Sequence, residues 1–560
     1  MLPRRVERHI SLGMLVMCAV FCFAFAHPVA AQAGEPPYFA IRNARIVPVS
    51  GPVLENGTVV MSRGLIAAVG REVAIPAEAL IIEGQGLTVY PGLIDAFTDL
   101  GLAIAPTSNP SPLSGAEAQR TATISRGPED RPGTTPWRDA ADELQPDDKR
   151  FESWRNAGFT TAVTAPHGGI FPGQAAIIDL AGERAGNLVV GAAVAVPVTL
   201  EPNRGFGNFP DSLMGVLAYV HQVWLDASWY SQADTMYEKH PTGLARPAYD
   251  RSGKVLARAL RDNELVLIPA NTRNQLLRAV DFPERWKVRG AIYGAQQAYE
   301  LADSIGAKKL PVLVNLKWPE KEKDADPAAE ESLRTLRFRD RAPSSPAALA
   351  KAGVKFAFYS GGITVPKDIL KAAKKSIDAG LAPEVALRAF TLSAAEIFGV
   401  ITRLGSIEPG KIANLVVTDG NLFEEKTKIK MVFVDGRKFE VHEPPTPENP
   451  PKGDISGKWK LSYTTPDGPE EGIADLAMES DGSVSGSFTS KRGDATISSG
   501  SVSGDKFNFK ISLAIEGEPT EITLSGTFEK NMMKGTIRVS GLVIDFTGSR
   551  PGSSRSAAEN

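Results

Sequence analysis

The sequence predicts an α/β core built on a parallel sheet, with a small β-sheet before the core and a separate all-β domain after it. Between residues 89 and 401, short apolar strands alternate with helical segments, which is typical of βαβ units. Residues 443–452 read EPPTPENPPK, a stiff proline-rich linker. Beyond it, residues 453–550 form alternating strands separated by Asp-Gly and similar turns, which predicts an antiparallel β-barrel or sandwich.

Composition and charge describe a globular chain of several domains. The 560 residues exceed the size of one ordinary domain, so about two or three domains are expected. Hydrophobic residues make up 42% and charged residues 23% of the chain, as in soluble globular proteins. The formal net charge is -3 and no basic stripe is concentrated anywhere, which argues against a nucleic-acid partner.

The first residues have the composition of a targeting segment. Residues 10–26 form an almost unbroken apolar run, and residues 31–33 (Ala-Gln-Ala) offer a cleavage site. The positive residues before the run are Arg4, Arg5 and Arg8. We therefore expect a signal peptide over residues 1–33, export to the periplasm or the extracellular space, and no membrane span after cleavage; an uncleaved anchor is the alternative. Both cysteines, Cys18 and Cys22, would leave with the signal.

The remaining segments can be assigned from periodicity. Residues 36–88 alternate like short strands with tight turns, and residues 213–237 follow helical spacing. Residues 102–148 predict a long irregular excursion with a short helix over 136–144, and residues 175–200 predict a β-hairpin outside the main sheet. Six core strands are expected, at residues 90–102, 159–165, 265–271, 288–293, 311–318 and 355–359.

Two stretches resemble the amidohydrolase superfamily. Residues 90–102 read YPGLIDAFTDLGL, close to the first-strand pattern P-G-(L/F)-I-D-x-H-x-H. The helical segment before residue 403 carries the pattern T-x-x-x-A, and residues 403–438 match the closing pattern G-(S/T)-I-x-x-G-K-x-A-D-L and V-x-V-x-G, except that Asn414 replaces the usual aspartate. The matching positions are Thr391, Ala395, Gly405, Ser406, Ile407, Gly410, Lys411, Ala413, Leu415, Val434 and Gly436. The resemblance implies a TIM-like (β/α)8 barrel over residues 89–401 and a composite β-sandwich from residues 36–88 with 402–442.

The resemblance also implies a chemistry. In this superfamily one or two divalent metals, zinc or another ion, sit at the barrel mouth and activate a water that attacks a non-peptide carbon–nitrogen bond. The first-strand histidines of the pattern are ligands of that metal. In this chain Phe97 and Asp99 stand in their places.

The other ligand positions are substituted as well. Of six histidines, four remain after the signal, and none falls where the family places a ligand: His167, His221, His240 and His442. The strand ends that should supply histidine or aspartate offer Asn271, Asn315 and Ser360 instead. The sequence therefore predicts no metal site and a catalytically degenerate member of the superfamily.

Two alternatives to a degenerate partner subunit stay open. Asp99 and His167 end the first two core strands and could form a rebuilt acid–base or metal site at one mouth, with Asn271 and Ser360 as neighbours. Alternatively, the protein binds a small-molecule ligand through its C-terminal β-domain. If the chain is instead a catalytically degenerate partner subunit, we expect a homo-oligomer or a complex with an active homologue.

Overall fold

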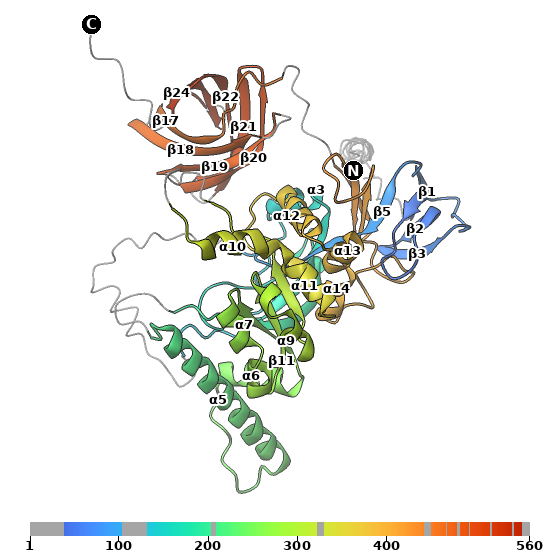
Figure 1. Ribbon diagram of the computed structural model, residues 1–560, viewed down its shortest axis with the longest axis vertical. Helices are drawn as coiled ribbons and strands as arrows, with labels where there is room; N and C mark the ends of the chain where they lie inside the picture. The colour runs from blue at the N-terminus through green and yellow to red at the C-terminus, as the bar shows by residue number, and fades with distance from the viewer. Residues whose placement is uncertain are drawn as a thin grey trace, which may run out of the picture. The chain divides into compact units, whose positions relative to one another are not determined.

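The computed structural model describes ten segments of the chain, which belong to two compact units (Figure 1). The described segments are 38–103, 131–202, 209–321, 330–441, 450–465, 468–478, 482–491, 493–515, 518–539 and 542–550. The first unit runs to residue 362 and resumes over 370–439, and the second contains 363–369 and the chain from 440. The predicted signal peptide over 1–33 and most of the predicted linker over 443–452 lie outside the described residues.

The first unit contains one sheet built from both ends of its chain. Its hydrogen-bonded order is β16-β15-β14-β5-β1-β2-β3, and β4 pairs with β1. The strands are β1 (Tyr38–Ile46), β2 (Leu54–Ser62), β3 (Leu65–Gly70), β4 (Leu80–Glu83), β5 (Thr88–Pro91), β14 (Leu415–Thr418), β15 (Ile429–Val434) and β16 (Arg437–Glu440). The N- and C-terminal segments join where β14 runs antiparallel to β5, with Leu415 opposite Pro91. Ile41, Val59 and Phe433 are fully buried in its core. The two distant segments therefore share one core.

The second sheet of this unit is the predicted barrel wall. It has eight strands in the order β13-β12-β11-β10-β9-β8-β7-β6. They are β6 (Leu93–Thr98), β7 (Phe159–Thr164), β8 (Ala175–Asp179), β9 (Val189–Pro197), β10 (Leu265–Ala270), β11 (Arg289–Gly294), β12 (Val312–Asn315) and β13 (Phe356–Tyr359). The two ends approach each other where the Ser360 backbone N–H donates to Asp95 Oδ1 at 3.0 Å. The fold class expected from the resemblance is confirmed.

The prediction that residues 175–200 lie outside the wall is wrong. β8 and β9 pair antiparallel with each other, and they continue the sheet from β7 to β10. β8 thus runs against the other seven strands, which are parallel to one another. β8 is buried throughout and β9 is buried over its last three residues, and together they fill the gap between β7 and β10 that would otherwise interrupt the sheet.

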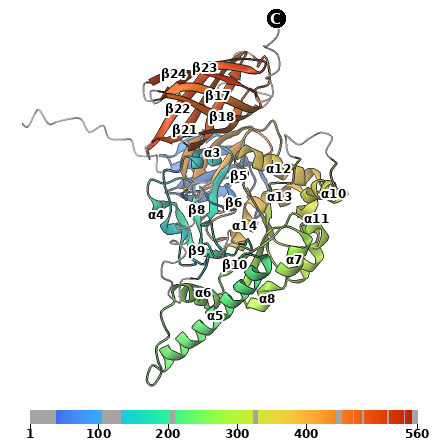
Figure 2. The ribbon, with the colours of Figure 1, turned by 90° about the vertical axis from the view of Figure 1, so that its left-hand side faces the viewer.

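Helices cover the outside of this sheet, since parallel strands require crossover connections. The helices are α3 (Arg150–Asn156), α4 (Ala185–Leu188), α5 (Leu213–Lys239), α6 (Arg251–Arg261), α7 (Arg273–Ala279), α8 (Phe282–Trp286), α9 (Ala302–Ala307), α10 (Leu333–Arg341), α11 (Ser345–Lys351), α12 (Lys367–Asp378), α13 (Pro383–Phe390) and α14 (Leu392–Ile397). Three 3-10 turns are η1 (Ala140–Asp142), η2 (Ala298–Glu300) and η3 (Ala342–Ser344). Figure 2 shows α5 as the longest helix of the covering layer.

Two sequence-based assignments can be compared with these helices. The helix predicted over residues 213–237 is confirmed as α5, whose Ser212 hydroxyl accepts a hydrogen bond from the Gly215 N–H. The helix predicted over 136–144 is wrong, since only the η1 turn forms there. Asp139 instead makes a parallel bridge to Gln174, which holds the backbone extended. Residues 104–130 of the excursion lie outside the described segments.

The second unit contains a closed antiparallel barrel of β17–β24, in which β17 also pairs with β24. Its strands are β17 (Gly457–Thr465), β18 (Gly468–Met478), β19 (Val484–Ser490), β20 (Gly493–Ser503), β21 (Lys506–Ile515), β22 (Glu518–Glu529), β23 (Met532–Val539) and β24 (Leu542–Ser549). Trp459, Phe509 and Phe546 belong to its buried apolar core. A ligand inside this barrel would therefore have to displace packed side chains.

No helix of the described segments combines the length and the apolar character that crossing a membrane requires.

Candidate functional site

A bulge in β6 decides which side chains reach the interior of the barrel. Along β6 the paired residues advance from Asp95 to Thr98, while along β7 they advance only from Ala162 to Thr164. Between these pairs β6 contains one residue more than β7, which is a β-bulge. Ile94 and Ala96 belong to the interior core, and Phe97 packs against the same core although it directly follows Ala96. Phe97, at a position that the family pattern gives to a histidine, therefore contributes a phenyl ring to the interior.

Phe97 lies in an aromatic cluster with Tyr293 of β11 and Tyr359 of β13. The ring centroids of Phe97 and Tyr293 are 5.0 Å apart, and those of Phe97 and Tyr359 are 5.8 Å apart in an edge-on arrangement. The Tyr293 hydroxyl donates to the Val198 carbonyl at 3.0 Å, and the Tyr359 hydroxyl bonds to the Asn315 side chain. Three strand ends thus converge on packed aromatic rings.

The two phenols of this aromatic cluster stay neutral near neutral pH. Burial raises the pKa of both Tyr293 and Tyr359 above the ordinary tyrosine value, because a phenolate would lose its hydration there. A neutral phenol is a poor metal ligand, since ligands bind in their deprotonated form. The aromatic cluster itself therefore brings no charge to these strand ends.

Asp99 and His167 are brought together, as their positions after β6 and β7 predicted. Asp99 Oδ2 lies 3.8 Å from His167 Nε2, and the imidazole is more than half exposed. The carboxylate of Asp99 is also held by Arg150, whose guanidinium lies 2.8 Å from Oδ1 and also donates to the Asp99 carbonyl at 3.0 Å. Arg150 begins α3 and binds Asp148 as well, so Asp99 belongs to an ion-pair network.

Asn271 and Ser360 occupy other strand ends. Asn271 follows β10 and is exposed, and its side chain lies over Gly294, where a Cβ atom would come within 2.3 Å of Asn271 Oδ1. Ser360 follows β13, is only 4% exposed, and is tied to Asp95. Within the described residues, neither side chain forms a hydrogen bond to Asp99 or His167. The two predicted mouth residues therefore support the strand ends and are not joined to that pair.

Sequence reasoning missed the buried carboxyl group of Asp95. It accepts from the Ser360 hydroxyl and N–H and, at 3.4 Å, from Trp154 Nε1. Burial raises the pKa of Asp95 to about 6, and these donors only partly oppose that rise. The sequence did contain one signal for this site, because Asp95 is a charged residue inside an otherwise apolar strand. The motif does not show which residue binds its carboxylate.

A second buried carboxyl group was also missed. Asp179 ends β8 and is 4% exposed, and it accepts from Thr161 Oγ1 at 2.9 Å and from Asn414 Nδ2 at 2.7 Å. Burial raises the pKa of Asp179 to about 7. The sequence offered one hint, because Asn414 departs from the aspartate of the family pattern. Asp179 and Asn414 join β8 to the loop before β14.

The residues at the mouth do not fit a divalent metal ion. A catalytic zinc normally takes three protein ligands of the histidine, cysteine or carboxylate type. Among the segments that the structure describes, no group of three or more such residues is placed to hold an ion. The mouth brings Asp99 and His167 together as one such pair, and the Arg150 guanidinium already forms an ion pair with Asp99.

Comparisons with known proteins agree with this architecture. Residues 325–442 match the model of the amidohydrolase family. An amidohydrolase from Thermotoga maritima MSB8 superposes with a TM-score of 0.60 at 24% identity, over 72% of this chain and 100% of that one. A Xaa-Pro dipeptidase with bound methionine aligns at 15% identity and a TM-score of 0.44, over 72% and 100% of the two chains.

An adenosine deaminase from Xanthomonas campestris with bound zinc aligns at 15% identity and a TM-score of 0.39, over 72% and 93%. The last two similarities are too loose to support further argument. No curated protein matches the sequence. The amidohydrolase family model thus matches residues 325–442, and the first unit, with its barrel and the sheet shared by both of its ends, has the amidohydrolase fold.

Proposed function

We propose that this chain is a catalytically degenerate amidohydrolase that serves as a binding or partner subunit. Membership of the superfamily implies an ancestor that hydrolysed non-peptide carbon–nitrogen bonds with a bound divalent metal. The observation that carries the proposal is the aromatic cluster of Phe97, Tyr293 and Tyr359 at the strand ends. Packed rings and neutral phenols supply neither the ligands nor the space that a metal-bound water needs.

A barrel without a metal ion can still be stable. The strand ends are fixed by contacts from Asp95 to Ser360 and from Tyr293 to Val198, which need no metal. A scaffold with a closed interior can still present its loops and outer helices to another protein. We therefore expect it to form a homo-oligomer or to associate with an active homologue.

Metal analysis of the purified mature protein tests this proposal. The chain would be expressed with zinc and manganese in the medium, dialysed, and measured by inductively coupled plasma mass spectrometry, alongside hydrolysis assays on dipeptides, N-acyl amino acids and ureas. We expect much less than one metal ion per chain and no turnover that a chelator abolishes. Stoichiometric metal together with chelator-sensitive turnover would refute degeneracy.

A rebuilt hydrolytic site is the second candidate, favoured by the 3.8 Å approach of Asp99 to His167. In that case Asp99 would be the acidic partner and His167 the base or ligand. Asp99→Ala and His167→Ala would then each remove bound metal and activity, whereas His240→Ala, in a loop elsewhere, would remove neither. If the parent chain binds no metal and turns over no substrate, the rebuilt site is excluded.

We also propose that the chain is exported. The support is the arginine-rich start, the apolar run over residues 10–26 and the small residues at 31–33. Cell fractionation followed by N-terminal sequencing tests it. A mature chain that starts close to residue 34 in the periplasm or the medium is expected, and a full-length chain confined to the cytoplasm would contradict export.

A further inference from the structure

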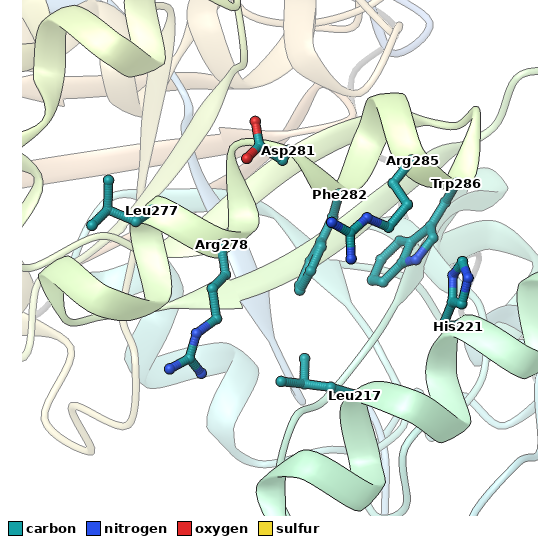
Figure 3. Close-up of a pocket in the computed structure, with 8 residues that line it drawn as sticks. All are labelled: Leu217, His221, Leu277, Arg278, Asp281, Phe282, Arg285 and Trp286. Atoms are coloured by element: carbon teal, nitrogen blue, oxygen red, sulfur yellow. The ribbon is translucent and has the colours of Figure 1, made fainter.

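A cavity lies on the outside of the barrel, between α5 and the pair α7–α8. Its volume is about 270 Å³. The lining side chains come from these three helices and from the turn between α7 and α8, which carries Asp281 (Figure 3): Leu217, His221, Leu277, Arg278, Asp281, Phe282, Arg285 and Trp286. α8 packs against the start of β11, where a Cβ on Gly290 would come within 2.5 Å of Pro283. The cavity is thus separate from the strand ends that hold Phe97.

The inner wall of the cavity is apolar and aromatic. Phe282 and Trp286 are stacked, with ring centroids 4.5 Å apart and an interplanar angle of 20°. Trp286 also stacks on Trp224 of α5 at 6.2 Å and 27°. These rings are buried, so they form a fixed flat surface. Such a surface suits the face of a single aromatic ring.

The rim of the cavity is cationic. Arg278 and Arg285 are exposed, and among the described residues neither guanidinium forms a hydrogen bond or an ion pair. The acidic residue of the lining, Asp281, lies 3.9 Å from Lys308 Nζ. Figure 3 shows the Asp281 carboxylate pointing away from Leu217, whereas Arg278 extends toward the side on which Leu217 lies. Two free guanidinium groups thus border the aromatic wall.

His221 adds a polar group that lacks a partner. Its ring is half-buried in the lining, and its Nδ1 is withdrawn from solvent without a hydrogen-bond partner in the described part of the chain. Trp224 Nε1, one turn further along α5, is likewise buried and unsatisfied. Polar atoms left unpaired in this way are uncommon in protein interiors, and they occur where a site is incomplete without a ligand or a water.

We propose that this cavity binds a small aromatic carboxylate. The ring would lie against Phe282 and Trp286, and the carboxylate would be held by Arg278 and Arg285. Guanidinium groups pair with carboxylates in strong, charge-assisted hydrogen bonds. Figure 3 shows the Arg285 side chain beside the Phe282 and Trp286 rings, on the side where the carboxylate of such a ligand would lie. The volume lies just under the usual range of about 300–1,000 Å³ for ligand sites, which restricts the ligand to roughly one ring system.

Calorimetric titration of the full-length mature protein with phenylacetate tests the proposal. Phenylacetamide has the same shape without the charge, acetate has the charge without the ring, and inorganic phosphate is a different anion. We expect saturable binding of phenylacetate and at least about tenfold weaker binding of each of the other three, which corresponds to about 1.4 kcal/mol.

Substitutions locate the site. Arg278→Gln and Arg285→Gln should each weaken phenylacetate binding about tenfold. Leu217→Phe, which fills the cavity without changing charge, should abolish binding while the melting temperature stays near that of the parent. Arg334→Gln, at an equally exposed arginine on α10, is the matched control and should change nothing.

Three results would overturn the inference: no saturable binding up to about 10 mM, equal binding of the amide or of phosphate, or full binding by the arginine and leucine variants. Asp99→Ala should leave phenylacetate binding intact, so the outcome is independent of whether the barrel mouth is catalytic.

Discussion

The stability of the first unit should depend on pH through Asp179. This carboxyl group is 4% exposed and accepts two hydrogen bonds, from Thr161 and Asn414. Its desolvation outweighs both bonds, and the Asp435 carboxylate nearby adds repulsion. Asp179→Asn is the informative change, because an amide oxygen can still accept both hydrogen bonds while the titrating proton is removed.

The direction and the size of this pH dependence follow from the coupling of proton binding to folding. The pKa of Asp179 is raised from 3.8 to about 7 by folding. Below about pH 4 the group is protonated in both the folded and the unfolded chain, so it contributes no pH dependence. Between about pH 4 and pH 7 the unfolded chain releases the proton and the folded chain keeps it, so stability falls as pH rises. Three pKa units at 1.36 kcal/mol each give a loss of about 4 kcal/mol, complete above pH 7.

Calorimetric unfolding of the parent and of Asp179→Asn over pH 4–8 measures this effect. The difference between the two proteins at each pH cancels all other titrating groups. We expect a small difference at pH 4 and a gain for the variant of up to about 4 kcal/mol at pH 8. A difference that does not change with pH, or a variant that is less stable at pH 8, would refute the reasoning.

Three further changes are expected to act locally. Asp95→Asn should gain up to about 3 kcal/mol relative to the parent between pH 4 and pH 6, because burial raises the pKa of Asp95 to about 6; calorimetry at each pH checks this. Phe97→Ala should lower the unfolding free energy by about 2 kcal/mol, since the half-buried ring leaves a partial cavity, as urea denaturation would measure. Trp459→Ala should destabilise the second unit by about 3–5 kcal/mol, because Trp459 is fully buried and donates to the Ile455 carbonyl at 2.8 Å; hydrogen exchange in β17–β24 should rise while exchange in the first unit stays constant.

Much of the fold could be predicted because its strands are continuous apolar runs. β10 and β11 are buried along most of their length, and such runs are recognisable wherever they occur in a sequence. β8 and β9 were assigned to the wrong place for a physical reason. Their antiparallel pairing is that of an ordinary hairpin, and only the pairing of β8 with β7 and of β9 with β10 makes them wall strands. Those contacts are long-range and leave no local pattern.

The candidate site was predictable in part. The end of a parallel strand can be recognised from sequence, so the approach of Asp99 to His167 could be predicted from their positions after β6 and β7. The role of Arg150 could not, because it begins a helix 51 residues further along the chain and reaches Asp99 only in the folded state. Phe97 points into the barrel because of a bulge in β6, and the residue types of β6 do not predict that bulge.

The hydrogen bonds of Asn414 explain why this chain has an asparagine where the family pattern has an aspartate. Its Nδ2 donates to Asp179 and to Thr161 Oγ1, and its Oδ1 accepts from the Asp435 N–H at 2.7 Å. An aspartate at 414 could accept from Asp435, but it could not donate to Asp179, and it would place a further carboxylate beside two acidic groups whose pKa values burial already raises. The amide is therefore the side chain that this environment requires, given an aspartate at the end of β8. The substitution at 414 thus reflects local packing and hydrogen bonding around Asp179, and it lends no support to the proposed loss of catalysis, which concerns Phe97 and the other strand ends.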